Sequence, residues 1–500
     1  MKRKLVSKIL AASMSASMLV GTMPANVFAE ETKWSEETTA DGWVKVTNTD
    51  GKTLGYSPES GVKIIEKDGY AFKDLNKNGE VDVYEDWRED DETRAKALAE
   101  TLTEEDIIPL LSHCALPQGM KAMEDDIVAE DKERLDIGQR SVQSGDMPSD
   151  PEKAVKFNNV IQAYVEGQGN GIPVSFSTDP GYGTLSDNKI LDGYPVSNLA
   201  LAATFDPELV SEASKEVSKL YRALGVTTLL GPQIDISTEP RWPRVQGTYG
   251  EDPALARDMA KAQIGAYQST FDEDGNDLGW GDDSILTVAK HFPGDGAGES
   301  GRESHNEYGK YAVYPGNNFE AHLIPFYDGA FNLDSTTEEA AAIMPSFSIA
   351  YSADGSLGEL VGTAYSDYKM GLLRDNGYDG LVVSDWQILT NKPWGVENLT
   401  QEEMGVKALE CGIDQFGGWW DMDVLNGIYD LLVEEMGEDA ALDRIRDSAR
   451  RLFVTFNKVD LFDNPYVDSA ESAALYSDES VKALAKDVNQ KGVVMLKNAD

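Results

Sequence analysis

Cysteine, histidine and basic residues are scarce in this sequence. Its 500 residues include two cysteines and four histidines, and 44 lysines and arginines stand against 88 aspartates and glutamates, so the formal net charge is −44. Two cysteines cannot build a disulfide framework, although Cys114 and Cys411 could pair in a secreted protein. The negative charge repels nucleic acids and anionic membranes and favours neutral ligands. With 41% hydrophobic residues, the chain must fold around a core of its own.

Long apolar runs are also missing. A weakly apolar stretch over residues 9–20 is too short to span a bilayer, and no later segment is long enough. Four basic residues precede this stretch, and Val27-Phe28-Ala29 places small residues at the two positions that a signal peptidase reads. We therefore predict that residues 1–29 are a signal peptide and that the mature protein is secreted. A buried N-terminal helix is the alternative interpretation.

A loop with the spacing of a calcium ligand set lies in the polar leader, residues 30–91. In "DLNKNGEVDVYE", Gly79 takes the sixth position, where an EF-hand loop turns sharply. Oxygen-bearing residues occupy positions 1, 3, 5, 7, 9 and 12, namely Asp74, Asn76, Asn78, Glu80, Asp82 and Glu85. The pattern predicts a structural Ca²⁺ that fastens the leader to the rest of the chain and takes no part in catalysis. A polar turn that only resembles this loop is the alternative.

Short apolar runs alternate with amphipathic stretches from about residue 171 onward. The runs are "IPVSFSTD", "TTLLGPQIDI", "ILTVAKHF", "AAIMPSFS", "GLVVSDW" and "ECGIDQF". Continuous apolar strands separated by helices indicate parallel strand–helix–strand units. The repetition of this unit predicts an α/β fold, a TIM-like (β/α) barrel over residues 92–465. A doubly wound open sheet is the alternative.

Nearly every apolar run ends in polar residues. At the carboxyl ends of parallel barrel strands such side chains converge on one face, where barrel enzymes carry their active sites. Each polar strand end taken alone is explained by contact with solvent, but their common register favours a site. These residues are Asp179, Asp235, Lys290, His291, Ser346, Asp385 and Asp414.

The run "GLVVSDW" carries the most specific chemistry. A carboxylate emerging from a buried strand, Asp385, can attack an anomeric carbon. The indole of Trp386 beside it can pack against a sugar face. A helix N-cap is the structural alternative for Asp385.

Three further motifs offer groups that bind hydroxyls. "AKHFPGDG" presents Lys290 and His291 next to glycine-rich backbone. "STEPRWPRVQG" presents Arg244, whose planar fork suits neighbouring oxygens. "FSTDPGYG" presents Asp179, which can accept hydrogen bonds from two hydroxyls. A solvated pair is the alternative for Lys290 and His291.

These four motifs, in this order, resemble those of glycoside hydrolase family 3, and the resemblance covers nearly all of the chain from about Asp74. It implies a (β/α) barrel followed by an α/β sandwich domain. It also implies a double-displacement mechanism that removes β-linked sugars from non-reducing ends without a catalytic cofactor. By this resemblance Asp385 is the nucleophile and Trp386 is a subsite wall. The residues implied to hold the terminal sugar are Asp179, Arg244, Lys290 and His291.

The general acid is not among these residues. Residues 466–500 look like a linker and the start of the family's second domain, with a helix followed by a strand, and in many members that domain supplies the acid. We therefore expect it beyond Asp500. Bacterial β-N-acetylglucosaminidases of the family use instead a histidine shortly after the Lys-His motif. Glu303-Ser304-His305 makes His305 the corresponding candidate, and Arg302 is expected to contact sugar with either acid.

One position departs from the family pattern. Many members have a tyrosine near the nucleophile where this chain has Phe347, which cannot donate a hydrogen bond to that carboxylate. The sequence favours a β-glucosidase that acts on oligosaccharides or glycosides. A β-N-acetylglucosaminidase, a β-xylosidase and a non-catalytic carbohydrate-binding protein are the alternatives, and the oligomeric state stays open.

Overall fold

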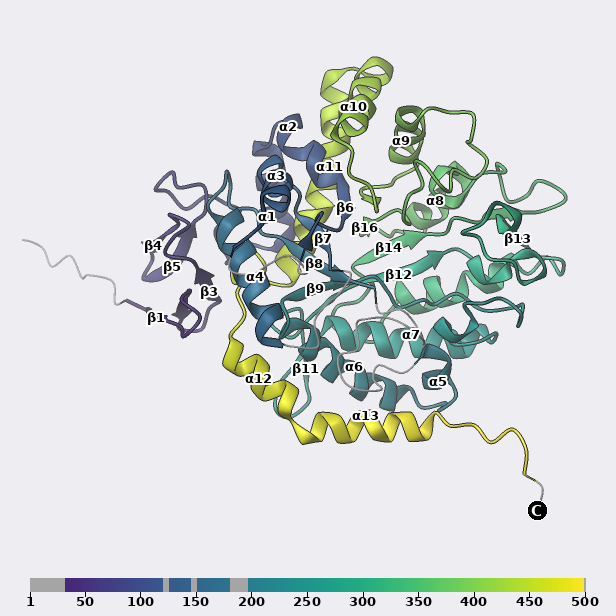
Figure 1. Ribbon diagram of the computed structural model, residues 1–500, viewed down its shortest axis with the longest axis horizontal. Coiled ribbons are helices and arrows are strands. Elements are labelled where there is room, and N and C mark those ends of the chain that lie inside the picture. Colours follow the sequence, from purple (N-terminus) through teal and green to yellow (C-terminus); the bar gives the residue numbers. More distant parts are fainter. Residues whose placement is uncertain (1–31, 120–125, 145–150, 180–196, 499–500) are drawn as a thin grey trace, which may run out of the picture.

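The computed structural model describes residues 32–119, 126–144, 151–179 and 197–498 (Figure 1). The predicted signal peptide lies outside the described residues. Among those that are described, no helix is both long enough and apolar enough to cross a membrane. Cys114 and Cys411 are both free thiols, so the pairing considered from the sequence is not formed.

Eight short parallel strands form the central sheet, in the order β16-β14-β12-β9-β8-β7-β6-β17. Their bounds are β6 (Ser112–Cys114), β7 (Ser141–Gln143), β8 (Ser175–Thr178), β9 (Val226–Leu229), β12 (Leu286–Phe292), β14 (Ala342–Pro345), β16 (Leu381–Val382) and β17 (Phe416–Gly417). A parallel bridge between Val383 and Gln415 joins the two outer strands and closes the sheet. The predicted barrel is therefore confirmed, and the open sheet is wrong.

Helices surround this sheet (Figure 1). They include α4 (Pro151–Glu166), α6 (Pro207–Arg222), α7 (Pro253–Gln268), the π-helical turn η8 (Pro325–Ala330), α8 (Asp367–Asp375), α9 (Gln401–Glu410), α10 (Met422–Met436) and α11 (Glu438–Lys458). Because they cover the outside and side chains fill the inside, a strand such as β12 is buried at all seven positions. This double burial explains why the strands read as continuous apolar runs rather than alternating ones.

Helix α6 shows how the sequence sets these boundaries. The side chain of Asp206 accepts a hydrogen bond from the Leu209 backbone N–H at 3.1 Å, and Pro207 occupies the first turn. The helix buries one face at helical spacing, formed by Leu209, Val210, Ala213, Val217 and Leu220. The polar face of the helix, with its lysines and glutamates, is left toward solvent.

The N-terminal leader forms two small antiparallel units, a sheet of β1 (Trp34–Thr38), β2 (Val44–Asn48) and β3 (Thr53–Tyr56), and a hairpin of β4 (Lys63–Lys67) and β5 (Tyr70–Asp74). A buried ion pair between Lys73 and Glu166, at 2.9 Å, holds this region to the barrel. On α1 (Asp91–Thr101), Arg94 forms a second buried pair with Asp463 at 2.8 Å and donates to the carbonyl of Tyr84 in the leader at 3.0 Å. Breaking either pair would leave a buried charge without its partner.

The chain ends in two helices, α12 (Ser469–Ser477) and α13 (Glu479–Lys491), which run along the outside of the barrel in yellow (Figure 1) and contact α4 and α6. The strand predicted after α13 does not form. Val493 and Leu496 are 77% and 94% exposed, and their backbone pairs with no described strand. A single strand needs a neighbouring edge for its hydrogen bonds, and none of the described strands offers one here.

Candidate active site

The predicted site residues gather at the carboxyl ends of the barrel strands. Asp179 follows β8, Lys290 and His291 lie near the end of β12, and Asp385 follows β16. The Lys290 ammonium lies 3.1 Å from Asp179 Oδ1, and His291 Nε2 lies 3.8 Å from Asp385 Oδ2. Arg244 Nη2 lies 3.3 Å from His291 Nε2. Five residues that the sequence spreads over 207 positions, from 179 to 385, are thus brought together.

Asp385 sits at the centre of this group. Its side chain is almost fully buried, and Oδ1 accepts a hydrogen bond from the Trp386 backbone N–H at 2.6 Å. Oδ2 is buried and has no hydrogen-bond partner among the described residues. One carboxylate oxygen is therefore fixed, and the other is left for a ligand.

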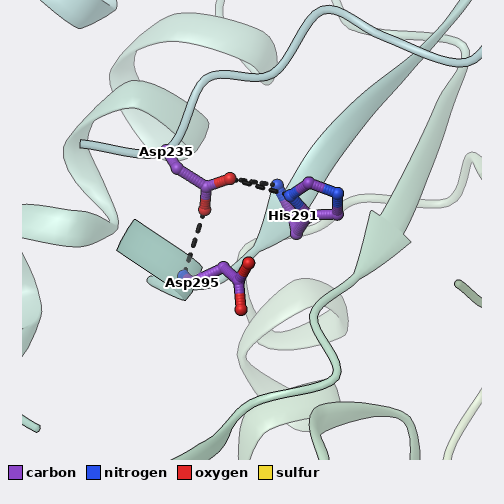
Figure 2. A group of neighbouring side chains, drawn as sticks. All are labelled: Asp235, His291 and Asp295. Carbon is purple, nitrogen blue, oxygen red and sulfur yellow. Dashed lines mark hydrogen bonds and ion pairs between the residues drawn. The ribbon is translucent and has the colours of Figure 1, made fainter. Parts of the chain in front are cut away.

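His291 is held by a residue that the sequence marked only as a polar strand end, Asp235. The carboxylate of Asp235 accepts hydrogen bonds from His291 Nδ1 at 2.8 Å and from the backbone N–H groups of His291 and Asp295, both at 3.1 Å (Figure 2). Burial, and next the charge of Arg244, lower the pKa of His291 to about 3. The imidazole is therefore neutral at ordinary pH, with its proton on Nδ1 toward Asp235, and Nε2 is an acceptor.

The same three residues are the only described group of histidine, cysteine and carboxylate side chains whose ligand atoms lie within 4.8 Å of one another. Each member already has partners: His291 and the Asp295 backbone donate to Asp235, and the Asp295 carboxylate accepts from Ser346 Oγ at 2.8 Å and from Ser348 Oγ. Figure 2 shows the three side chains and the hydrogen bonds that join Asp235 to His291 and to the backbone of Asp295. The group is therefore a hydrogen-bond network that positions His291, rather than a set of ligands facing one ion.

Arg244 supplies the main fixed positive charge. Burial disfavours its charged form, but the carboxylates of Asp295 and Asp385 outweigh that effect and raise its pKa. Its Nη1 also lies 3.8 Å from Glu303. A positively charged guanidinium is therefore held beside the carboxylate of Asp385.

Trp386 is fixed from both sides. Its indole Nε1 donates to Gln143 Oε1 at 2.9 Å, a contact that the sequence did not suggest because β7 is a short strand with no motif. A Cβ atom at Gly418, which has φ +64°, would lie 2.3 Å from Trp386 Cδ1. The glycine is needed there because the indole packs directly on its backbone. The ring is thereby held beside Asp385.

His305 lies at the edge of the group. Its Nδ1 is 2.8 Å from Glu303 Oε2, and its ring meets Phe347 edge-on at 4.9 Å between centroids. Burial opposes ionisation of Glu303, but the hydrogen bond and charge of His305 outweigh it and lower the pKa of Glu303. Glu303 contacts both His305 and Arg244, and it thereby links the edge of the group to its centre. Arg302, in contrast, is half-exposed and pairs with Glu299 at 3.3 Å, so the structure does not bring it into the group.

Phe347 is buried between the Lys392 ammonium and the His305 ring. The Lys392 ammonium lies 4.6 Å from the centre of the Phe347 ring and donates to the Trp386 carbonyl at 3.2 Å. Burial lowers the pKa of Lys392. Many family members carry a tyrosine at this position. Here the Phe347 ring lies under the Lys392 ammonium instead, a contact that no pattern in the sequence predicted.

Comparisons with known proteins identify the family. The model of the glycosyl hydrolase family 3 N terminal domain matches residues 123–452. The periplasmic beta-glucosidase/beta-xylosidase of Dickeya chrysanthemi is 34% identical over 88% of this chain and 69% of its own length. Beta-glucosidase C of Emericella nidulans is 33% identical over 81% of this chain and 65% of its own.

Solved structures agree on the fold. The β-glucosidase EmGH1 of Erythrobacter marinus superposes with a TM-score of 0.67 at 24% identity, over 83% of this chain and 52% of that one. A β-glucosidase of Listeria innocua in complex with glucose gives a TM-score of 0.61 at 20% identity, over 81% and 52%. The chain therefore spans about two thirds of these curated relatives and about half of the solved structures.

Proposed function

Because the chain belongs to glycosyl hydrolase family 3, we propose that its barrel is the catalytic domain of a retaining exo-β-glycosidase that acts on β-glucosides. The observation that carries this proposal is the state of Asp385. Its Oδ1 is fixed by backbone, and its buried Oδ2 has no partner among the described residues and faces His291. A carboxylate held in this way is prepared for attack on carbon.

The proposed reaction has two displacements. In the first, Asp385 Oδ2 forms a bond to the anomeric carbon while the bond to the leaving oxygen breaks and a general acid protonates that oxygen. In the second, the conjugate base takes a proton from water, and the water oxygen displaces Asp385. Two inversions at the same carbon give net retention of the β configuration.

The remaining residues hold the sugar during both steps. Lys290 donates and Asp179 accepts, so the pair can bind two adjacent hydroxyls together. His291 Nε2, neutral because of its low pKa, can accept from a hydroxyl while Asp235 fixes its ring. Trp386 lies beside them as an apolar face. Positioning of this kind supplies a large share of enzymatic rate enhancement.

Retention is the first test of this proposal. Proton NMR of the earliest product released from an aryl β-glucoside should show the β anomer before mutarotation, because double displacement inverts the carbon twice. An α-anomeric first product would overturn the proposal, since it requires direct attack of water.

The Glu303–His305 contact favours a second candidate, a β-N-acetylglucosaminidase in which His305 is the acid/base. If it is correct, His305→Ala should lower kcat/KM for aryl N-acetyl-β-glucosaminides by about 10²- to 10⁴-fold, as expected for losing a general acid. Aryl glycosides with dinitrophenolate leaving groups, which need little protonation, should be affected much less in their first step. Arg302→Ala is the matched control, since Arg302 lies outside the group. Equal activity of His305→Ala and wild type would exclude this candidate.

We further propose that the loop from Asp74 to Glu85 binds Ca²⁺. The Asp74 and Glu85 side chains are 5% and 3% exposed, yet neither forms an ion pair with any described lysine or arginine. Burial raises the pKa of Glu85. A buried carboxylate pair without a positive partner is costly, and a bound cation would offset that cost.

The backbone of this loop also fits such an ion. Gly79, at φ +82°, donates its N–H to Asp74 at 3.2 Å, and the Asn76 and Asn78 amides both contact Asp82 Oδ2, at 2.6 and 2.7 Å. Oxygen-bearing side chains are therefore already gathered on one side of the turn. The loop follows strand β5 rather than a helix, so it is the loop alone that resembles an EF-hand.

Calcium is therefore expected to stabilise the fold. The melting temperature should rise on adding Ca²⁺ and fall on adding EDTA. When the free ion is at 100 times its Kd, it should raise the free energy of unfolding by about 2.7 kcal/mol. Asp74→Asn combined with Glu85→Gln should abolish this response, because the two buried carboxylates of the proposed ligand set are lost. Asp50→Asn, in the neighbouring turn, is the control. A wild-type melting temperature that does not respond to Ca²⁺ would refute the site.

A further inference from the structure

A groove on the outside of the barrel shares no residue with the site around Asp385. It has a volume of about 610 Å³, within the usual range of ligand sites of roughly 300–1,000 Å³. Its walls come from the segments that follow β13 (Tyr311–Val313) and β15 (Ile349–Tyr351), and from η8 and α8. Nothing in the proposed catalytic reaction uses this groove.

Two half-exposed tyrosine rings line the groove. Tyr351 and Tyr368 are each 43% exposed. Tyr351 ends β15 in register with Val313 and meets the Tyr311 ring edge-on at 6.2 Å. A Cβ atom at Gly358 would lie 2.7 Å from Tyr368 Cβ, so the backbone of the 352–358 loop packs closely against this side chain. These contacts restrict both side chains before a ligand binds, and such restriction lowers the entropy lost on binding.

The polar lining of the groove has one sign of charge. Glu320, Asp328 and Asp354 contribute carboxylates, and Asn317 contributes an amide. No lysine or arginine of the described chain lines it. Such a surface repels phosphates, uronates and nucleic acids, and its oxygens accept hydrogen bonds from hydroxyl groups.

We propose that this groove is a second saccharide site, which binds a neutral oligosaccharide chain without cleaving it. Tyrosine faces that pack on C–H surfaces, together with carboxylates that accept from hydroxyls, are the two features that recognise an uncharged sugar. A cationic ligand would satisfy the same carboxylates, but exposed carboxylates spread along a groove suit a ligand with many hydroxyls better than one point charge.

The groove is also connected to the catalytic end of the barrel. Tyr314 forms part of its lining and donates its hydroxyl to the Gly294 carbonyl at 3.1 Å, next to Asp295 of the network behind His291. A chain held in the groove would raise the local concentration of sugar ends near the site. This role rests on the proposed function, whereas binding in the groove is measured independently of it.

Native gel electrophoresis of the full chain in mixed-linkage β-glucan or xyloglucan tests the groove. We expect both neutral polymers to retard the wild type. The double variant Tyr351→Ala/Tyr368→Ala should bind about tenfold or more weakly, as expected for losing two aromatic contacts. Tyr308→Ala removes a ring that is 68% exposed outside the groove and should behave as wild type. Labelling of Asp385 by a fluorinated glycoside should be the same in all three proteins.

The outcomes separate the two proposals. No retardation by either neutral polymer, retardation by cationic chitosan alone, or an equal loss in Tyr308→Ala would each overturn the saccharide groove. Labelling of Asp385 without retardation would overturn only the groove. If the wild type is retarded, the double variant Tyr351→Ala/Tyr368→Ala is not, and Asp385 is not labelled, the result would support the groove and contradict the proposed catalytic function.

Discussion

Replacing Asp385 with asparagine is expected to lower kcat/KM for aryl β-glucosides by about 10⁴-fold or more, in line with the loss of other catalytic nucleophiles. The amide is the same size as the carboxylate and can still accept the hydrogen bond from the Trp386 N–H. It has no charge, however, and its oxygen is a poor nucleophile. The loss should therefore appear in kcat rather than in the binding of the sugar.

The control for this variant is Asp375→Asn, an exposed carboxylate at the end of α8. It should leave kcat/KM unchanged, and both variants should melt within a few degrees of wild type. Activity of Asp385→Asn within tenfold of wild type would mean that another group attacks the sugar, and the proposed mechanism would have to be abandoned.

The second large effect on activity is expected from replacing Asp235, which positions His291 and is not proposed to contact the substrate. Asp235→Asn should lower kcat/KM by about 10- to 100-fold, the usual cost of losing a partner that orients a site residue. An amide at this position places an N–H₂ group among four donors: His291 Nδ1, the backbone N–H groups of His291 and Asp295, and Gln233 Nε2. At least one of these donors then has no acceptor in a buried place.

Positioning can be told apart from a general loss of stability. If Asp235 orients the imidazole, the variant should lose affinity for glucose-like competitive inhibitors even at temperatures where it is fully folded. His291→Ala should remove about as much activity, and the double variant little more, because both changes break one unit. Additive losses, or unchanged inhibitor binding, would contradict this role.

The barrel and the central site residues could be predicted from the sequence because their signals are local. A buried barrel strand gives a short apolar run followed by a polar residue, a pattern that can be recognised without knowing the fold. Asp385, His291 and Lys290 each lie at the end of such a run. The closure of the sheet through Val383 and Gln415 could not be read, since it depends on tilt and register between strands far apart in the chain.

The supporting residues were beyond sequence reasoning for a related reason. Gln143 and Lys392 matter only because the fold places them against Trp386 and Phe347, and neither stands in a recognisable motif. The pairing of Arg302 with Glu299, away from the group around Asp385, could not be predicted either, because the motif does not reveal that neighbouring contact. The strand predicted after α13 does not form, because no described strand lies beside it to accept its hydrogen bonds. A local apolar pattern cannot show whether such a neighbour exists.

Covalent trapping tests the central claim most directly. The protein is incubated with a 2-deoxy-2-fluoro-β-glucoside that carries a dinitrophenolate leaving group, which departs with little help from an acid. Peptide mass spectrometry should then find one fluoroglucosyl group, on the peptide that contains Asp385. An adduct on a different carboxylate, or release of dinitrophenolate with no adduct at all, would contradict the assignment of Asp385 as the nucleophile.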